Sequence, residues 1–283
     1  MDSLSSLLHP ENLRRLHFSG KYIAKQLEAR GEEMLRLTEG FQDPPLTVLI
    51  RTRNNEKHLP GLLEDIARQK YDGPVELLVV DTESTDKTLE YARAAGAKVI
   101  PITQADFSYP KSLNAGFEAA SSPYVLTLVG HSNLASTYTF KAVTYWSQRP
   151  KFGGAYALYV PNFDASRAEL FSADLLSAFF MKPLIEKRSH MGLLAANASV
   201  VSVAAWKELG GYDDRYGAGG EDTALGRSML AAGMLVAREL LLVPHHSHGL
   251  SFGGMVRQYR YWQKIAKPLP FDVAALATYR NKL

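Results

Sequence analysis

The chain has 283 residues, a formal net charge of +3 and no cysteine. This length suffices for one large domain with a substantial apolar core. The lack of cysteine excludes disulfide scaffolds, thiolate metal sites and cysteine nucleophiles. So small a charge gives no reason to expect a nucleic-acid partner.

No apolar run approaches the roughly 20 residues that span a bilayer, and the first residues lack the features of a secretion signal. We therefore expect a cytoplasmic protein without a transmembrane segment. Peripheral contact with the inner face of the membrane stays open.

Residues 1–43 are polar, and residues 21–37 are rich in strong helix formers. We expect a helical N-terminal extension that stops before Pro44 and Pro45, because proline cannot continue a helix. Such an extension is typical of an arm that packs on its own domain or forms a homodimer.

The next stretch alternates short apolar runs with amphipathic segments. The predicted strands cover residues 46–50, 75–80, 97–102 and 124–129. The predicted helices cover 59–67, a segment capped by Ser84 or Thr85 that ends near Gly96, and 110–120. This alternation predicts parallel βαβ units, whose ligands bind at the carboxyl ends of the strands.

The second half is less regular. Strands are predicted at 156–160, 198–203 and 235–243, and a helix at 221–232 follows a glycine-rich loop at 213–220. Gly253 and Gly254 precede an aromatic, basic helix at 255–267 that suits a membrane interface, a lid or a dimer contact. The predicted fold is α/β and Rossmann-like, with a mainly parallel sheet flanked by helices and helical extensions at both ends.

Polar side chains follow the first two predicted strands. Arg51 and Arg53 could bind phosphate, and Thr52 offers a hydroxyl to a nucleotide. Asp81 could accept hydrogen bonds from a base or ribose, or it could cap the next helix.

Five segments in order resemble family-2 glycosyltransferases with the GT-A fold. They are residues 52–54, 80–86, 111–116, 219–222 and 246–248. The last is similar to a segment of rhamnosyltransferase-like members, and the resemblance covers roughly residues 46–250. It implies a GT-A domain at 44–250, with a nucleotide-binding half at 44–133 and an acceptor half at 134–250, before a helical extension at 251–283.

The resemblance implies an inverting transferase, of the kind used in polysaccharide biosynthesis. It would move a sugar from a nucleotide-diphosphate sugar to a hydroxyl of a glycan, a lipid-linked molecule or a small molecule. Asp222 would be the general base, with Glu221 beside it. The residues that would line the donor site are Arg51, Thr52, Arg53, Glu56, Asp81, Lys111, Asn114, Gly130 and His131.

Two positions depart from the family pattern. Glu83 stands where glycine is usual, which indicates a backbone position that is costly for other residues. Gly130 and His131 occupy the end of the usual Asp-any-Asp motif, so His131 stands where the metal-binding aspartate is expected. In an extended backbone His246 and His248 share a face and could complete a three-histidine site with His131. Imidazole can bind Mn²⁺, whereas Mg²⁺ prefers oxygen, and a reaction without metal remains open.

Two other functions remain open. A sugar nucleotidylyltransferase usually has a glycine-rich loop after the first strand, which residues 51–55 lack. A non-catalytic sugar-nucleotide or glycan-binding homologue would explain the missing Asp-any-Asp motif, but the intact Glu221 and Asp222 argue against it. The helix dipole alone could favour these two acids. Trp206, Tyr212 and Tyr216 suit either sugar stacking or the core.

Overall fold

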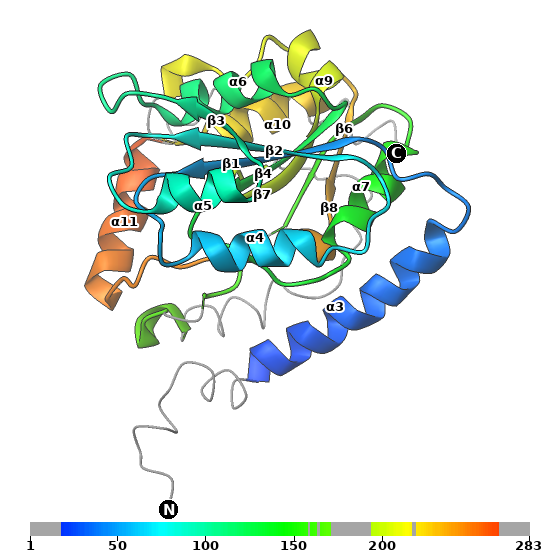
Figure 1. Ribbon diagram of the computed structural model, residues 1–283, viewed down its shortest axis with the longest axis horizontal. Coiled ribbons are helices and arrows are strands. Elements are labelled where there is room, and N and C mark those ends of the chain that lie inside the picture. The colour runs from blue at the N-terminus through cyan, green and yellow to red at the C-terminus, as the bar shows by residue number, and fades with distance from the viewer. Residues whose placement is uncertain (1–17, 158, 163–164, 171–193, 217–218, 266–283) are drawn as a thin grey trace, which may run out of the picture.

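The computed structural model describes residues 18–157, 159–162, 165–170, 194–216 and 219–265. Within them a seven-stranded sheet has the order β3-β2-β1-β4-β7-β6-β8 (Figure 1). The strands are β1 Leu46–Thr52, β2 Val75–Asp81, β3 Lys98–Pro101, β4 Tyr124–Val129, β6 Phe152–Tyr156, β7 Ala198–Ser202 and β8 Leu235–Arg238. All neighbours pair in parallel except β7, which is antiparallel to β4 and β6. The expected mixed α/β fold with a mainly parallel sheet is therefore confirmed.

Helices cover both faces of this sheet (Figure 1). One face carries α3 Phe18–Leu37, α4 Leu59–Ala67, α5 Thr88–Ala94 and α7 Thr139–Ser147. The other carries α6 Tyr109–Ala119, α9 Val203–Glu208 and α10 Glu221–Ala231. Helix α11, Phe252–Ile265, lies beyond the carboxyl ends of β1 and β2, at the left of Figure 1. Among the described residues no helix is long and apolar enough to cross a membrane.

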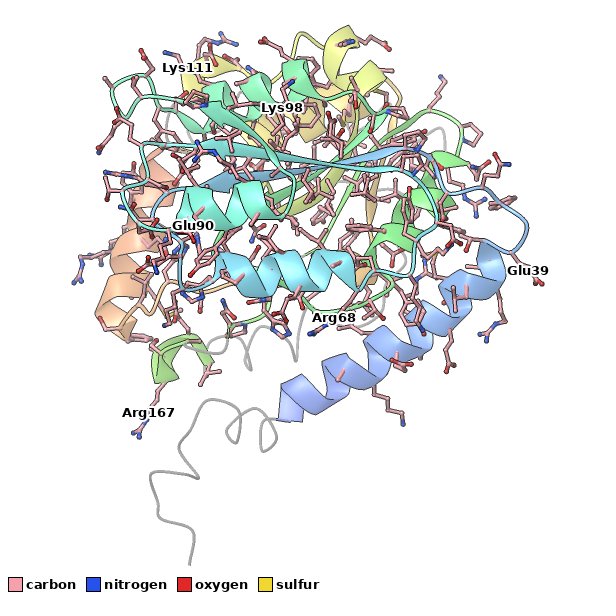
Figure 2. All side chains as sticks on the ribbon, viewed as in Figure 1. Glu39, Arg68, Glu90, Lys98, Lys111 and Arg167 are labelled. Carbon is pink, nitrogen blue, oxygen red and sulfur yellow. The ribbon has the colours of Figure 1, made fainter. Side chains whose placement is uncertain are left out.

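The core explains the continuous apolar run of the first strand. Val48 and Ile50 pack in the core cluster that includes α4 and α7 residues, whereas Leu49 packs with Leu113 and Phe117 of α6 in the other cluster. A parallel strand buried on both faces favours such an unbroken run. Charged side chains such as Arg68, Glu90 and Lys98, which are labelled in Figure 2, are exposed.

A second, two-stranded sheet joins distant parts of the chain. β5 Asn133–Leu134 pairs antiparallel with β9 Pro244–His245, and Val160 forms a bridge with His245. The segment after β4 therefore lies beside the segment that carries the late histidines.

A buried ion pair ties α3 to the domain. Arg30 donates from Nε and Nη2 to the Glu239 carboxylate at 3.1 and 2.7 Å, and Trp146 Nε1 donates to the same carboxylate at 3.0 Å. Arg30 is 6% exposed and Glu239 only 1%. Burial opposes the charge, yet the contacts with Glu239 raise the pKa of Arg30. The N-terminal helix is thus packed on its own domain.

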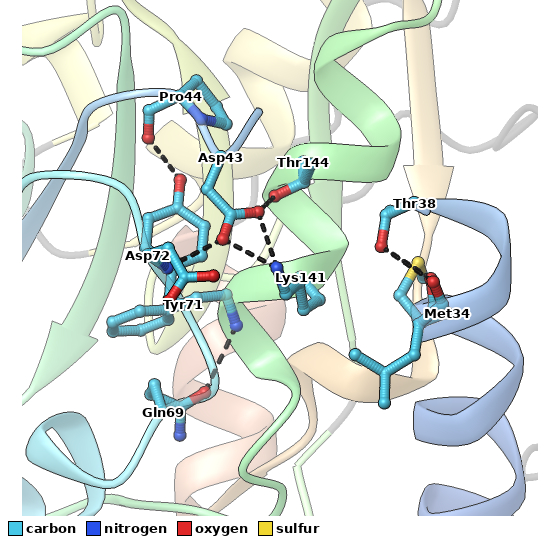
Figure 3. A network of polar contacts seen from close by, with 11 residues as sticks. Met34, Thr38, Asp43, Pro44, Gln69, Tyr71, Asp72, Lys141 and Thr144 are labelled. Atoms are coloured by element: carbon cyan, nitrogen blue, oxygen red, sulfur yellow. Dashed lines mark hydrogen bonds and ion pairs between the residues drawn. The ribbon is translucent and has the colours of Figure 1, made fainter. Parts of the chain in front are cut away.

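The junction between α3 and β1 has its own polar network, shown in Figure 3. The Asp43 carboxylate accepts hydrogen bonds from Lys141 Nζ at 2.7 Å, from Thr144 Oγ1 at 2.5 Å and from the Asp72 N–H at 2.8 Å. Burial alone would raise the pKa of Asp43, but these hydrogen bonds lower it. The link into the first strand is therefore fixed against α7.

Two predicted strands are wrong in extent. The expected strand at 156–160 is instead β6, Phe152–Tyr156, because Gly153 and Gly154 pack closely and give the strand little apolar signal. A Cβ on Gly154 would lie 3.0 Å from the Val200 carbonyl oxygen. The strand expected at 235–243 ends at Arg238, since Glu239 caps the 3₁₀ turn η2, Leu240–Leu242.

Smaller corrections concern helix ends. α5 begins at Thr88, with Lys87 as its N-cap, so neither Ser84 nor Thr85 caps it. Gly253 and Gly254 lie inside the first turn of α11 rather than before it. The expected glycine-rich loop contains the 3₁₀ turn η1, Asp214–Tyr216. Residues 1–17 and 266–283 of the expected extensions lie outside the described residues.

We predict that Arg30→Met lowers the free energy of unfolding by about 3 kcal/mol, because Glu239 loses its cation in a buried position. Urea denaturation measures the change. The control is Arg68→Met, which removes the exposed pair with Glu64 and should cost less than about 1 kcal/mol. Equal losses in the two variants would contradict the role assigned to Arg30.

Candidate functional site

The loops after β1 and β2 are held together by side-chain to backbone hydrogen bonds. The Asn54 N–H donates to Ser84 Oγ at 2.9 Å, and Asn54 Oδ1 accepts from the Thr85 N–H at 2.8 Å. The Glu56 carboxylate accepts from the Lys87 N–H at 3.1 Å. Glu56, which the sequence suggested is in the donor site, thus joins the loop after β1 to the loop after β2.

Asp81 lies buried at the end of β2. Its carboxylate accepts from the N–H of Ser84 at 2.9 Å and from the Ser84 hydroxyl at 2.5 Å. Asp81 therefore braces a tight turn, in place of the helix cap considered from the sequence. Glu83 in this turn has φ 51°, which confirms the expectation of a position that favours glycine.

Gly130 brings the ends of β4 and β1 into close contact. Its N–H donates to the Arg51 carbonyl oxygen at 2.8 Å. A Cβ at this position would lie 2.5 Å from Thr52 Oγ1 and 2.6 Å from Asn55 Oδ1. Thr52 Oγ1 is buried and has no hydrogen-bond partner within the described residues. The position consequently requires glycine, and it places His131 directly beyond the end of β1.

Three histidines meet at this edge of the sheet. His131 Nε2 and His246 Nε2 lie 3.0 Å apart, and ligand atoms of His131, His246 and His248 all lie within 4.8 Å of one another. The pairing of β5 with β9 brings them together. The structure thus assembles the three-histidine cluster that the sequence suggested.

The pKa shifts of His246 and His248 favour neutral imidazoles at these two positions. Burial lowers the pKa of His246 to about 3, and electrostatic interactions with His131, His248 and Arg51 act in the same direction. Burial also lowers the pKa of His248, although Glu169 opposes that shift. Neutral imidazole is the form that binds metal. His246 Nδ1 is buried without a hydrogen-bond partner among the described residues, so this ring nitrogen remains unsatisfied there. The donor set therefore fits a divalent transition-metal ion.

The acidic pair begins α10. Gly219 and Gly220 precede it with φ 141° and 95°, and they turn the chain sharply into the helix. Glu221 is 3% exposed. Asp222 Oδ2 accepts from the Ala196 N–H at 3.1 Å, and Oδ1 accepts from the Thr223 N–H at 2.6 Å. The backbone thereby fixes the Asp222 carboxylate in one orientation.

The pKa values of both acids are raised. Burial, followed by the charge of Asp222, raises the pKa of Glu221 to about 7. Burial raises the pKa of Asp222 too, while the two N–H donors and Arg51 oppose the shift. At neutral pH this pair is therefore poised to exchange a proton.

Arg51 connects the two clusters. Its Nη2 donates weakly to the Ala196 carbonyl oxygen at 3.5 Å, and its guanidinium lies 5.1 Å from the Tyr109 ring centroid. Its charge lowers the pKa of Glu221, Asp222 and His246. The charge of one guanidinium thus acts on both the acids and the histidines.

The remaining expected donor residues differ in their surroundings. Arg53 is exposed and donates to Gln104 Oε1 at 2.8 Å, and Lys111 is exposed on α6 (Figure 2). The Asn114 amide accepts from Trp206 Nε1 and the Tyr212 N–H and donates to the Tyr212 carbonyl oxygen. Asn114 therefore holds α6 against the turn that precedes η1.

The sequence alone did not indicate the roles of some residues near the site. Trp206 and Tyr212 are buried against Phe117, which confirms the core role rather than sugar stacking. Tyr159 is exposed and packs edge-on against His246, with ring centroids 5.3 Å apart. Nothing in the sequence marks Tyr159 or Ala196, because each acts only through the neighbour that the fold supplies.

Comparison with known proteins defines the class of this chain. The model of the family described as glycosyl transferase family 2 matches residues 47–190, about half of the sequence. The chain therefore belongs to glycosyl transferase family 2.

The curated relatives are similar over shorter stretches. A 4,4'-diaponeurosporenoate glycosyltransferase of Staphylococcus haemolyticus (strain JCSC1435) is 43% identical over 103 residues, which are 36% of this chain and 26% of that protein. The protein of the same name from Staphylococcus aureus (strain USA300) is 36% identical over 73 residues, 26% of this chain and 19% of the relative. The matched part thus spans about a quarter of the relatives' length or less.

Solved structures share the fold. A mannosyltransferase from Pyrobaculum calidifontis in complex with GDP-Man and Mn²⁺ has a TM-score of 0.58 at 16% identity, covering 86% of this chain and 72% of that chain. Glucosyl-3-phosphoglycerate synthase from Mycobacterium tuberculosis, with phosphoglyceric acid, has a TM-score of 0.54 at 16% identity, covering 88% and 83%. Staphylococcus aureus TarS 1-349 with UDP-GlcNAc has a TM-score of 0.52 at 15% identity, covering 78% and 65%. At these identities the likeness establishes the GT-A fold.

We predict that Gly130→Ala lowers the free energy of unfolding by about 1–3 kcal/mol, because the added methyl group would overlap Thr52 Oγ1. Urea denaturation measures the loss. Gly253→Ala is the matched control, since its Cβ would meet only Arg257 Nη1 at 3.6 Å and alanine favours a helix. Wild-type stability in Gly130→Ala would show that the two strand ends can separate freely.

Proposed function

We propose that this protein transfers a sugar from a nucleoside-diphosphate sugar to a hydroxyl acceptor, with inversion at the anomeric carbon. The observation that carries the proposal is the position of Arg51, whose charge acts on both the Glu221–Asp222 pair and the histidine cluster. A base and a site for a charged leaving group thereby share one edge of the sheet. Donor complexes of proteins with the same fold, with GDP-Man and with UDP-GlcNAc, support this reading.

The donor nucleotide would lie over the carboxyl ends of β1 and β2. Thr52 Oγ1 is a buried hydroxyl available for a hydrogen bond, and the Asp81 carboxylate retains acceptor capacity beyond its bonds to Ser84. Exposed Arg53 and Lys111 would supply positive charge toward the phosphates. Asn114 would contribute by fixing α6, since its amide is bonded within the protein.

The chemistry needs one base. Asp222 would take the proton of the acceptor hydroxyl as the acceptor oxygen bonds to the anomeric carbon, and the bond from that carbon to the diphosphate oxygen would break. Attack from the face opposite the leaving group inverts the anomeric centre. The fixed orientation of Asp222, held by the Ala196 and Thr223 N–H groups, supports this assignment.

His131, His246 and His248 would hold a divalent ion when one is bound. Such an ion would supply positive charge beside the leaving diphosphate. Because the three donors are nitrogen atoms, we infer a preference for Mn²⁺ over Mg²⁺, which favours oxygen ligands.

The exposed side chains of helix α11 indicate one class of acceptor. Phe252 and Tyr261 are 68% and 51% exposed, and Arg257 and Arg260 are exposed on the same helix. Aromatic and basic side chains together suit the interface between lipid and water. A lipid-linked hydroxyl is therefore among the acceptors that we propose.

We predict that Asp222→Asn lowers turnover by about 100-fold or more while donor binding persists, because the amide cannot accept the proton. Release of nucleoside diphosphate measures turnover with UDP-, GDP- and dTDP-sugars, and a thermal shift measures binding. Asp214→Asn, an exposed acid on η1, is the control. Near wild-type turnover in Asp222→Asn would refute the base assignment. Donor binding without turnover in the wild-type protein would favour the non-catalytic alternative.

We predict that the purified protein binds Mn²⁺ and that His131→Ala weakens this binding about tenfold or more, because one ligand of the cluster is lost. Titration calorimetry on metal-stripped protein measures the affinity without any sugar substrate. His245→Gln is the control, because its ring contacts the Pro161 carbonyl oxygen outside the cluster. Identical affinity in His131→Ala and wild type would exclude the three-histidine site.

A further inference from the structure

The side chains of Arg51 and Asp222 both form hydrogen bonds with the backbone of Ala196. Arg51 Nη2 donates to the Ala196 carbonyl oxygen at 3.5 Å, while Asp222 Oδ2 accepts from the Ala196 N–H at 3.1 Å. The guanidinium is also packed against the Tyr109 ring. The position of Arg51 is therefore fixed relative to the acidic pair. The sequence suggested that Arg51 binds phosphate. Its contacts with Ala196 and Tyr109 instead hold the guanidinium within the protein.

Unpaired polar atoms gather in the same place. Arg51 Nε, Tyr212 Oη and Glu221 Oε2 are buried, and none has a hydrogen-bond partner within the described residues. The charges of Asp222, Glu221 and Arg51 all act on Tyr212, so the four side chains form one group, which we call the acid cluster. Buried polar atoms are rarely left unpaired in proteins, and such a concentration indicates a functional requirement.

The two carboxyl groups of the acid cluster differ in their support. Asp222 accepts two backbone hydrogen bonds, which stabilise a carboxylate, whereas Glu221 Oε2 accepts none. Two adjacent carboxylates in a buried site repel each other strongly, so one of them keeps a proton near neutral pH. Glu221, whose Oε2 is unpaired among the described residues and whose carboxyl group has a backbone hydrogen bond only from its own N–H, is the member that retains it, in accord with a pKa raised to about 7 by burial and by Asp222.

The charged and titratable groups around Asp222 come from several elements. Arg51 comes from β1, Tyr212 from the segment before η1 and Glu221 from α10 itself. Burial raises the pKa of Tyr212, which stays a neutral phenol. The positive charge of Arg51 opposes the rise in the pKa of both carboxyl groups.

We propose that Arg51 is a positioning residue of the acid cluster, which keeps Asp222 ionised as the base and leaves the shared proton on Glu221. This inference rests on the proposed transferase function in one respect only, namely that Asp222 acts as the base in sugar transfer. The protonation pattern itself belongs to the protein without substrate.

The test therefore follows carboxyl protonation in the full chain without donor or acceptor. Infrared difference spectroscopy across the pH range detects the carbonyl band of a protonated acid. In wild type we expect one buried acid that titrates near pH 7, and Glu221→Gln should remove its band. In Arg51→Gln we expect a second protonated acid at neutral pH, with the titration of the pair shifted upward by about one pH unit or more.

Three further variants make the result specific. Arg51→Lys keeps the charge and should restore a titration close to wild type. Arg51→Met keeps the apolar stem, so it replaces Arg51→Gln if that variant does not fold. Arg93→Gln, which removes an exposed arginine on α5, should leave the carboxyl titration unchanged. The proposal is overturned if both neutral variants titrate like wild type, or if Asp222→Asn rather than Glu221→Gln removes the neutral-pH band.

Turnover separates this inference from the function on which it rests. A base with a raised pKa needs a higher pH to ionise, so the acid limb of the turnover profile should move upward in Arg51→Gln and return in Arg51→Lys. Absence of turnover together with the expected titrations would refute the transferase function alone. Turnover together with unchanged titrations would refute the role of Arg51 alone.

Discussion

The close contact between the carboxyl ends of β1 and β4 determines the rest of the site. Gly130 has no side chain, so its backbone can bond to the Arg51 carbonyl oxygen and lie against Thr52. That contact places His131 beside the end of β1, while the Arg51 side chain extends to the acidic pair. A larger residue at position 130 would meet Thr52 and Asn55 and disturb the contact between the strand ends that carry the proposed site.

The N-terminal helix supports this arrangement from the other end of the chain. Glu239 directly follows β8, caps η2 and pairs with Arg30 of α3. The same segment continues through β9 to His246. Helix α3, which the sequence suggested is an extension, is therefore part of the domain's packing. It supports the late histidines indirectly, through Glu239 and the segment that runs from Glu239 to His246.

The sequence predicted strands correctly where the apolar pattern allowed a single interpretation. β1, β2 and β4 were predicted because a strand buried on both faces leaves an unbroken apolar run. β6 was mislocated because Gly153 and Gly154 satisfy a packing requirement that local propensity does not register. The triple leucine of η2 was mistaken for strand because Glu239, whose role depends on distant Arg30, ends the strand early.

The site was predictable to the same extent. Parallel strands end at one edge, so Thr52, Asp81 and His131 were expected to lie near each other. The connection of Arg51 to Asp222 through Ala196 was not predictable, because it joins β1 to a segment 145 residues later through backbone atoms. The internal bonds of Asn114 were equally hidden, since its partners lie beyond position 200.

The bonds between the loops after β1 and β2 have a thermodynamic consequence. Asn54 and Glu56 join these loops by hydrogen bonds within the protein itself. A nucleotide that settles over them would not have to order the backbone beneath it. Little conformational entropy would be lost there on association, so more of each contact with the base and ribose would appear as affinity.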